Sequence, residues 1–198
     1  VQGDVVFDRI SAKDGHGRPL FTGLALMIPA GERVGLLGPS GAGKSTLARC
    51  LNLLERPTSG KVVVNGEDLT ALGTSGLRDA RRRIGTVFQS ASLLSRRTAA
   101  QNVALPLEYL GATKRSTTAR VGELLDLVGL ADKADLYPHQ LSGGERQRMT
   151  IARLLLAQPS VVILDEATAH LDSTSEAAVQ AALGEALEGP APSSPWRR

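Results

Sequence analysis

A glycine-rich stretch near residue 40 has the residue types and spacing of a phosphate-binding loop. Residues 38–46 read GPSGAGKST and fit the pattern G-x-x-x-x-G-K-[ST]. The glycines let backbone N–H groups turn inward around phosphate oxygens, Lys44 can reach the outer phosphates, and the Ser45 hydroxyl can ligate Mg²⁺. A plain glycine turn explains the pattern less well, because the stretch follows an apolar run and opens a helix-forming one. The residues expected to bind the ligand are Gly38, Pro39, Ser40, Gly41, Ala42, Gly43, Lys44, Ser45 and Thr46.

Two adjacent carboxylates end another apolar run. Residues 161–166 read VVILDE, the pattern of a buried strand that ends at Asp165 and Glu166. In open α/β sheets, ligands bind at the carboxyl ends of strands. Asp165 can therefore hold Mg²⁺, directly or through water, and Glu166 can take a proton from the water that attacks the γ-phosphate. Without a phosphate loop in the chain, such an acidic pair would simply indicate a solvated strand end.

Two further segments carry candidate ligand-binding groups. Gln89 ends the apolar run of residues 83–89 and can reach metal or water, although a lone glutamine is usually a surface residue. Ser142, Gly143 and Gly144 precede the helix-forming run ERQRMTIARLLLA, and glycines at a helix start often bind anions through backbone N–H groups. The chain thus contains two anion-binding patterns about a hundred residues apart.

The surrounding sequence predicts an α/β fold with a mostly parallel sheet and an antiparallel N-terminal part. Apolar runs predict strands at residues 4–10, 24–30, 33–38, 61–64, 83–89 and 161–164, with an Asn-Gly turn after the fourth. A helix is expected from Lys44, with Leu47, Cys50, Leu51 and Leu54 on one face. That placement makes Cys50 a core residue rather than a nucleophile.

Residues 90–140 predict a mainly helical insertion, in which Val121, Leu124, Leu125 and Val128 share one helix face. A last helix is expected after Ser173, which forms a capping-box pattern with Glu176. We predict one domain over residues 1–188, followed by a proline- and serine-rich tail at 189–198.

The overall composition argues against several classes of protein. The 198 residues include 42% hydrophobic and 22% charged ones, an ordinary globular balance, and the net charge is only +3. We therefore expect no nucleic-acid partner, and the basic cluster at residues 78–83 is interpreted as a solvated face. The single cysteine allows no internal disulfide, which fits a reducing compartment. No apolar run approaches the ~18 residues that span a bilayer.

The motifs GPSGAGKST, VFQS, LSGGERQR and VVILDEATAHLD, in this order, resemble the nucleotide-binding domain of ABC transporters. The resemblance covers roughly residues 5–188 and implies a P-loop NTPase core that binds and hydrolyses ATP with Mg²⁺. It also implies that two such domains pair head to tail, as a homodimer or with another ABC domain. Ser142, Gly143 and Gly144 would then bind the γ-phosphate of the partner's ATP, with Asp172 at the dimer seam. Gln89 and the helical insertion would face integral membrane permease subunits, on the cytoplasmic side of the plasma membrane.

The branch of the family remains open at this point. Segments such as CLNLLERPTSG and LVGLADKADLYPHQLSGG resemble the methionine-import ATPases, which suggests amino-acid import. The two ends of the chain, VQGDVVFDRIS and ILDEATAHLDSTSEAAVQAAL, resemble the exporter branch instead. A soluble ABC ATPase acting on nucleic acid is a further alternative, but such proteins usually carry twin domains or special insertions.

The sequence departs from the family in two places. SAKDGHGRP contains no Phe, Tyr or Trp, although the family usually stacks an aromatic ring on adenine here; His16 can stack weakly or is simply a loop histidine in solvent. Prolines 190, 192 and 195 are incompatible with the expected C-terminal strand, so that C-terminal strands and a γ-phosphate-contacting histidine are expected to be missing. A shifted reading frame over residues 189–197 is one hypothesis for this tail. The alternative function is a hydrolysis-impaired domain that acts only as an ATP-dependent dimerisation module.

Overall fold

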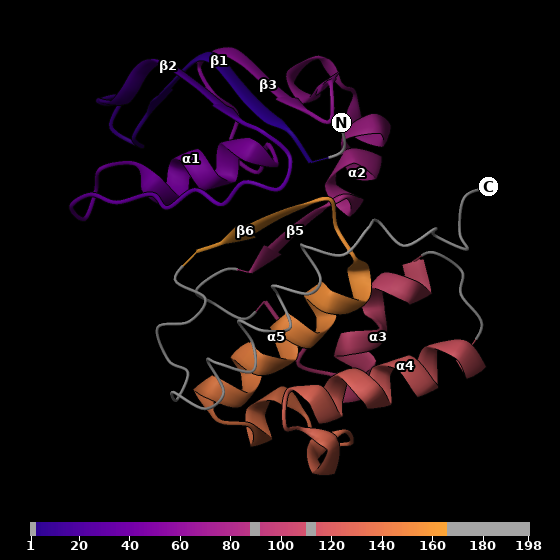
Figure 1. Cartoon of the computed structure of the whole chain (residues 1–198). Coiled ribbons are helices and arrows are strands. Elements are labelled where there is room, and N and C mark those ends of the chain that lie inside the picture. Colours follow the sequence, from indigo (N-terminus) through magenta and orange to yellow (C-terminus); the bar gives the residue numbers. More distant parts are fainter. Residues whose placement is uncertain (1–2, 88–91, 110–113, 166–198) are drawn as a thin grey trace. The chain divides into compact units, whose positions relative to one another are not determined.

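The computed structural model describes residues 3–87, 92–109 and 114–165 (Figure 1). The chain divides into two compact units. The first contains Val1–Gly85 and Pro159–Asp165, and the second contains Thr86–Gln158 and Glu166–Arg198. The candidate ligand-binding segments are distributed over both units.

The first unit contains a four-stranded antiparallel sheet. It consists of β1 (Val5–Lys13), β2 (Pro19–Ile28), β3 (Ser59–Val64) and β4 (Glu67–Asp68), in the order β2-β1-β3-β4. The antiparallel N-terminal part is therefore confirmed. Val64 pairs with Glu67, which leaves Asn65 and Gly66 as a two-residue turn with φ of 53° and 77°. Two left-handed residues are what a tight hairpin turn needs, so the predicted Asn-Gly turn is also confirmed.

A bulge interrupts β1 and sets which residues face the core. Val5 and Phe7 are buried, the pattern shifts at Arg9, and burial resumes at Ile10. Arg9 has a left-handed φ of 50°. The neighbouring strand accommodates the bulge at Gly60, where a Cβ would lie only 2.4 Å from the Arg9 carbonyl oxygen. The close approach of two backbones explains the glycine at this position.

Helix α1 (Lys44–Leu51) contacts β1 and β3 and lies against one face of the sheet (Figure 1). Its buried residues include Leu47, Cys50 and Leu51, as predicted. The prediction for Leu54 is wrong, because the helix ends at Leu51 and the backbone turns at Leu53, which has a φ of 51°. That turn buries Leu53 in the core and leaves Leu54 53% exposed.

The rest of the first unit includes the strand that precedes Asp165. It includes η1 (Leu69–Ala71), α2 (Thr74–Arg82), β6 (Val161–Leu164) and the first two residues of β5 (Ile84–Val87), the strand that pairs in parallel with β6. Ile84, Val161 and Ile163 join the same apolar core as the sheet and α1. The strands predicted from residues 83–89 and 161–164 are thus confirmed where the structure describes them.

The prediction of a buried strand at residues 33–38 is wrong for this structure. Neither described sheet includes this segment, and Leu37 is 97% exposed. A strand requires a neighbour to satisfy its backbone N–H and C=O groups, and an apolar run by itself does not supply one. The segment therefore reaches the phosphate loop as irregular backbone.

The second unit is built from helices α3 (Ala99–Tyr109), α4 (Lys114–Leu127) and α5 (Gly143–Ala157), which contact one another in all three pairs. Two short 3₁₀ turns, η2 (Ala131–Lys133) and η3 (Pro138–Gln140), connect α4 to α5. The four residues predicted to share one helix face, Val121, Leu124, Leu125 and Val128, are all buried. Within the described ranges, no helix is long and apolar enough to cross a membrane.

Candidate functional site

The phosphate-loop sequence forms an open loop that ends at the N-terminus of α1. Gly43 is the residue that caps the helix, and its φ of 87° is left-handed. A Cβ at Gly43 would lie 3.2 Å from the Leu20 Cβ and 3.4 Å from Phe21 Cδ1. Backbone conformation and available space therefore both require glycine here.

The N-terminus of α1 is suited to an anion. No side chain caps it, and its first turn contains no acidic residue. The first N–H groups of a helix have no intrahelical partner, and the helix dipole makes this end positive. Ser45, in the first turn, is exposed, so a ligand can approach this helix end directly.

Lys44 adds a full positive charge to the loop. Its Nζ donates hydrogen bonds to the carbonyl oxygens of Gly38 and Pro39, each at 2.8 Å. The side chain therefore turns back over the loop instead of extending into solvent. The ammonium group and the helix dipole act in the same direction, so both favour a bound polyanion.

Ser45 and Asp165 meet although 120 residues separate them in the sequence. The Ser45 hydroxyl donates to Asp165 Oδ1 at 3.2 Å. The hydroxyl comes from the first turn of α1, and the carboxylate directly follows β6. These are two hard oxygen donors of the type that Mg²⁺ prefers, next to a phosphate loop. The group therefore fits the ion that the sequence indicates.

The second anion-binding pattern lies at the start of α5, in the other unit. Ser142 caps this helix, and its Oγ accepts from the Glu145 N–H at 3.3 Å. In return, Glu145 Oε2 accepts from the Ser142 N–H at 2.7 Å. This reciprocal capping box fixes the helix start, while Ser142 and Gly143 remain exposed.

Glu145 is also bound by Lys133 of η2. Its Oε1 accepts from Lys133 Nζ, and its side chain is only 15% exposed. The hydrogen bond from Lys133, followed by the one from the Ser142 N–H, lowers the pKa of Glu145 from 4.5 to about 2. Glu145 is thus a fixed carboxylate with both oxygens engaged.

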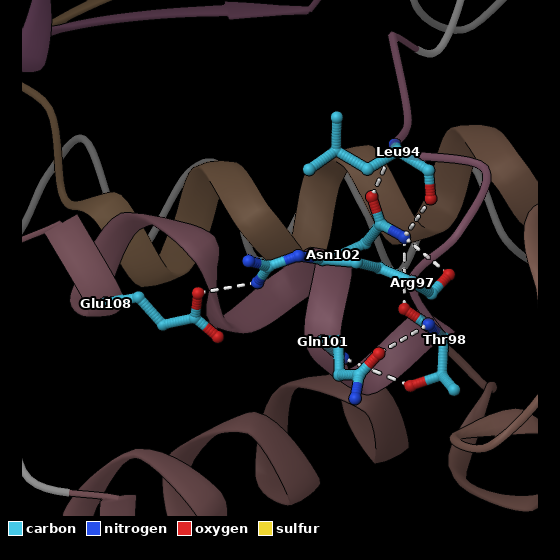
Figure 2. A network of polar contacts seen from close by, with 6 residues as sticks. All are labelled: Leu94, Arg97, Thr98, Gln101, Asn102 and Glu108. Atoms are coloured by element: carbon cyan, nitrogen blue, oxygen red, sulfur yellow. Dashed lines mark hydrogen bonds and ion pairs between the residues drawn. The ribbon is translucent and has the colours of Figure 1, made fainter.

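A buried asparagine organises the segment that precedes α3 (Figure 2). Asn102 Oδ1 accepts from the Leu94 N–H at 2.8 Å, and Nδ2 donates to the carbonyls of Leu94, Arg97 and Thr98 at 3.0–3.1 Å. Thr98 and Gln101 exchange capping hydrogen bonds at the start of the same helix. These contacts hold residues 94–98 against α3.

Several predicted site residues lie outside the described residues. They are Gln89, Glu166 and Asp172, together with Ser173 and the tail at 189–198. The structure therefore brings Lys44, Ser45 and Asp165 together in one unit and places Ser142–Gly144 at a helix start in the other. In the described part of the chain, no cluster of three or more His, Cys, Asp or Glu side chains forms a separate metal site.

Sequence reasoning missed three of these features. The capping box at Ser142 and Glu145 has the recognisable pattern S-x-x-E and could have been found. The roles of Lys133 and Asn102 had no such signal, because each depends on the path of an irregular segment nearby in the sequence.

Comparison with known proteins identifies the family. The sequence profile of a family described as "ABC transporter" matches residues 21–169. The chain belongs to the ABC transporter family. A methionine import ATP-binding protein MetN 3 of Pectobacterium atrosepticum is 52% identical over 164 residues, which are 83% of this chain and 48% of that protein. MetN 1 of Salmonella typhi is 58% identical over 149 residues, 75% of this chain and 43% of that protein. The chain spans slightly less than half the length of these relatives.

Solved ABC structures share the fold. A dimeric ATP-binding cassette in a post-hydrolysis state, bound to ADP and phosphate, superposes with a TM-score of 0.86 at 33% identity, covering 93% of this chain and 83% of that one. CbiO1 of Clostridium perfringens, part of the CbiONQ ABC transporter complex, gives a TM-score of 0.76 at 29% identity, covering 91% and 72%. The P-loop NTPase fold predicted from the motifs is therefore confirmed.

Proposed function

We propose that this ABC domain binds ATP with Mg²⁺ at residues 38–46 and hydrolyses it to drive membrane transport. The observation that carries the proposal is the approach of Ser45 to Asp165, 3.2 Å apart, beside an uncapped helix start and Lys44. Magnesium, when bound, neutralises charge on the outer phosphates. Backbone N–H groups of the loop and the Lys44 ammonium bind the phosphates, and Ser45 and Asp165 hold the ion.

Glu166 is assigned as the general base for the attacking water, and Gln89 as a ligand of water or metal. Glu166 directly follows Asp165, so the same strand end would supply metal ligand and base. Catalysis here consists mainly of positioning and electrostatic stabilisation, because the transferred phosphoryl group needs little covalent assistance from protein.

The helix start at Ser142–Gly144, where Ser142 and Gly143 are exposed, is proposed to bind the γ-phosphate of ATP held by a paired domain. The dimeric cassette found among the similar structures supports such pairing. Two positive helix ends around one triphosphate would couple nucleotide binding to closure of the dimer.

We infer that the transported substrate is methionine and that transport is import. The relatives named above are methionine import ATP-binding proteins, which favours import over the exporter-like reading of the two ends. The partners would be integral membrane permease subunits, with this domain bound peripherally at the cytoplasmic side of the plasma membrane. The CbiONQ complex is a precedent for such assembly in the family.

The test is phosphate release by the purified protein with ATP and Mg²⁺, compared with Glu166→Gln and Lys44→Ala. We expect turnover that Glu166→Gln abolishes while nucleotide still binds, whereas Lys44→Ala loses binding. Turnover unchanged by both substitutions would refute the proposal. Nucleotide-dependent pairing without phosphate release would instead establish the alternative, a binding and dimerisation module.

A further inference from the structure

The two helix starts assigned to the triphosphate differ in charge. The first turn of α1 contains no acidic residue, whereas the first turn of α5 contains Glu145. A carboxylate in the first turn stabilises its own helix through the dipole, but it also repels an anionic ligand at the same helix end. A helix start that is to bind a γ-phosphate therefore needs this charge compensated.

Lys133 supplies that compensation. It lies in η2, twelve residues before Glu145, and its Nζ bonds to Glu145 Oε1. The side chains of Lys133 and Glu145 are 32% and 15% exposed, so water screens the pair only in part. The other carboxylate oxygen is held by the Ser142 N–H, so the carboxylate cannot swing away from the helix start.

We propose that Lys133 is a positioning residue of the ATP site: it neutralises the charge of Glu145, which keeps the start of α5 electropositive toward the partner's triphosphate. This inference rests on the proposed role of Ser142–Gly144. Without Lys133, the capping box would remain, but the negative charge of Glu145 at this helix start would no longer be offset by the lysine.

The opposing interpretation is that Lys133 only stabilises the fold. The two interpretations differ in what happens when Glu145 also loses its charge. If Lys133 acts through charge, Lys133→Gln is harmful only while Glu145 is ionised. Glu145→Gln keeps the capping geometry, since glutamine also serves in a capping box. The double variant Lys133→Gln/Glu145→Gln should then pair normally.

The experiment measures dimerisation of the purified protein by sedimentation velocity with the non-hydrolysable analogue AMP-PNP and Mg²⁺. Lys133→Gln is expected to weaken dimerisation about twofold to fivefold per site, a range set by typical charge effects at helix ends. In a homodimer with two equivalent sites, this factor applies twice. Lys133→Arg, which keeps the charge, and the double variant should both stay close to the parent protein.

A matched control removes another positive charge from the same unit. Arg120 pairs with Glu123 on the surface of α4, and Arg120→Gln should leave dimerisation unchanged. Thermal melts accompany each variant to show that it is folded. Dimerisation of Lys133→Gln equal to the parent, or a double variant as weak as Lys133→Gln, would overturn the inference.

One further variant separates this inference from the proposed function itself. A Cβ added at Gly143 meets no atom within 4 Å, so Gly143→Leu is tolerated by the fold but fills the space in front of the helix start. If Gly143→Leu pairs like the parent, the proposed site is wrong. If Gly143→Leu fails to pair while Lys133→Gln pairs normally, only the role of Lys133 is wrong.

Discussion

Replacing Asn102 by alanine removes the side chain that holds residues 94–98 against α3. Asn102 is fully buried, and its amide bonds four backbone groups. Two of them keep another partner: the Leu94 carbonyl accepts from the Arg97 N–H, and the Thr98 carbonyl accepts from the Asn102 N–H. The Leu94 N–H and the Arg97 carbonyl bond only to Asn102 among the described contacts.

The expected loss of stability follows from these two backbone groups. A buried polar group left without a partner costs about 1–3 kcal/mol, and the lower half of that range applies because this network is only partly buried. Asn102→Ala should therefore reduce the free energy of unfolding by about 2–4 kcal/mol. For a chain of this size, the melting temperature should fall by roughly 4–16 °C.

Urea unfolding followed by far-UV circular dichroism measures the change. The matched control is Arg97→Gln in the same segment, which removes the 2.5 Å ion pair with Glu108, both side chains being more than a third exposed. That variant should lose less than about 1 kcal/mol. Equal stability of Asn102→Ala and Arg97→Gln would refute the reasoning, because it would mean that water replaces the amide at no cost.

Three other outcomes are expected. Gly60→Ala should unfold or precipitate the protein, because the added Cβ would lie 2.4 Å from the Arg9 carbonyl oxygen. Gly66 has a similar φ but open space around it, so Gly66→Ala should lower the free energy of unfolding by only about 1 kcal/mol. Equal melting temperatures for the two would contradict the bulge geometry. Burial raises the pKa of Cys50 to about 11, so a thiol reagent at pH 8 should label the protein only after unfolding; rapid labelling of the native state would be inconsistent with a core position. The pKa of Glu145 falls from 4.5 to about 2 on folding. Its contribution to the stability of the fold is therefore complete above pH 4.5 and disappears as the pH falls toward 2. Glu145→Gln should flatten the decline of melting temperature in that window, and an unchanged decline would count against the Lys133 pair.

Local patterns predicted the parts of the fold whose geometry depends on neighbouring residues. The glycine spacing of residues 38–43 predicted a loop that opens α1, and Asn65-Gly66 predicted a hairpin turn. The approach of Asp165 to Ser45 followed from a general rule, since strands of an open α/β sheet end beside the phosphate loop.

Features that depend on distant partners were not predictable in this way. Residues 33–38 have the composition of a buried strand, but composition does not supply the neighbour that a strand requires. Leu54 fits the helical spacing, yet the helix ends earlier because Leu53 adopts a left-handed backbone. The contact between Lys133 and Glu145 spans a connection of loops and the short turn η3, which periodicity does not describe.

The central claim is that the loop at residues 38–46 binds a nucleoside triphosphate through Lys44. Calorimetric titration with AMP-PNP and Mg²⁺ tests it most directly, with Lys61→Ala as the control because Lys61 is an exposed lysine of the same unit. The account predicts at least about tenfold weaker binding for Lys44→Ala, since a charge-assisted phosphate contact contributes roughly 1.5–3 kcal/mol, and unchanged binding for Lys61→Ala. Equal affinity of Lys44→Ala and the parent protein would contradict it.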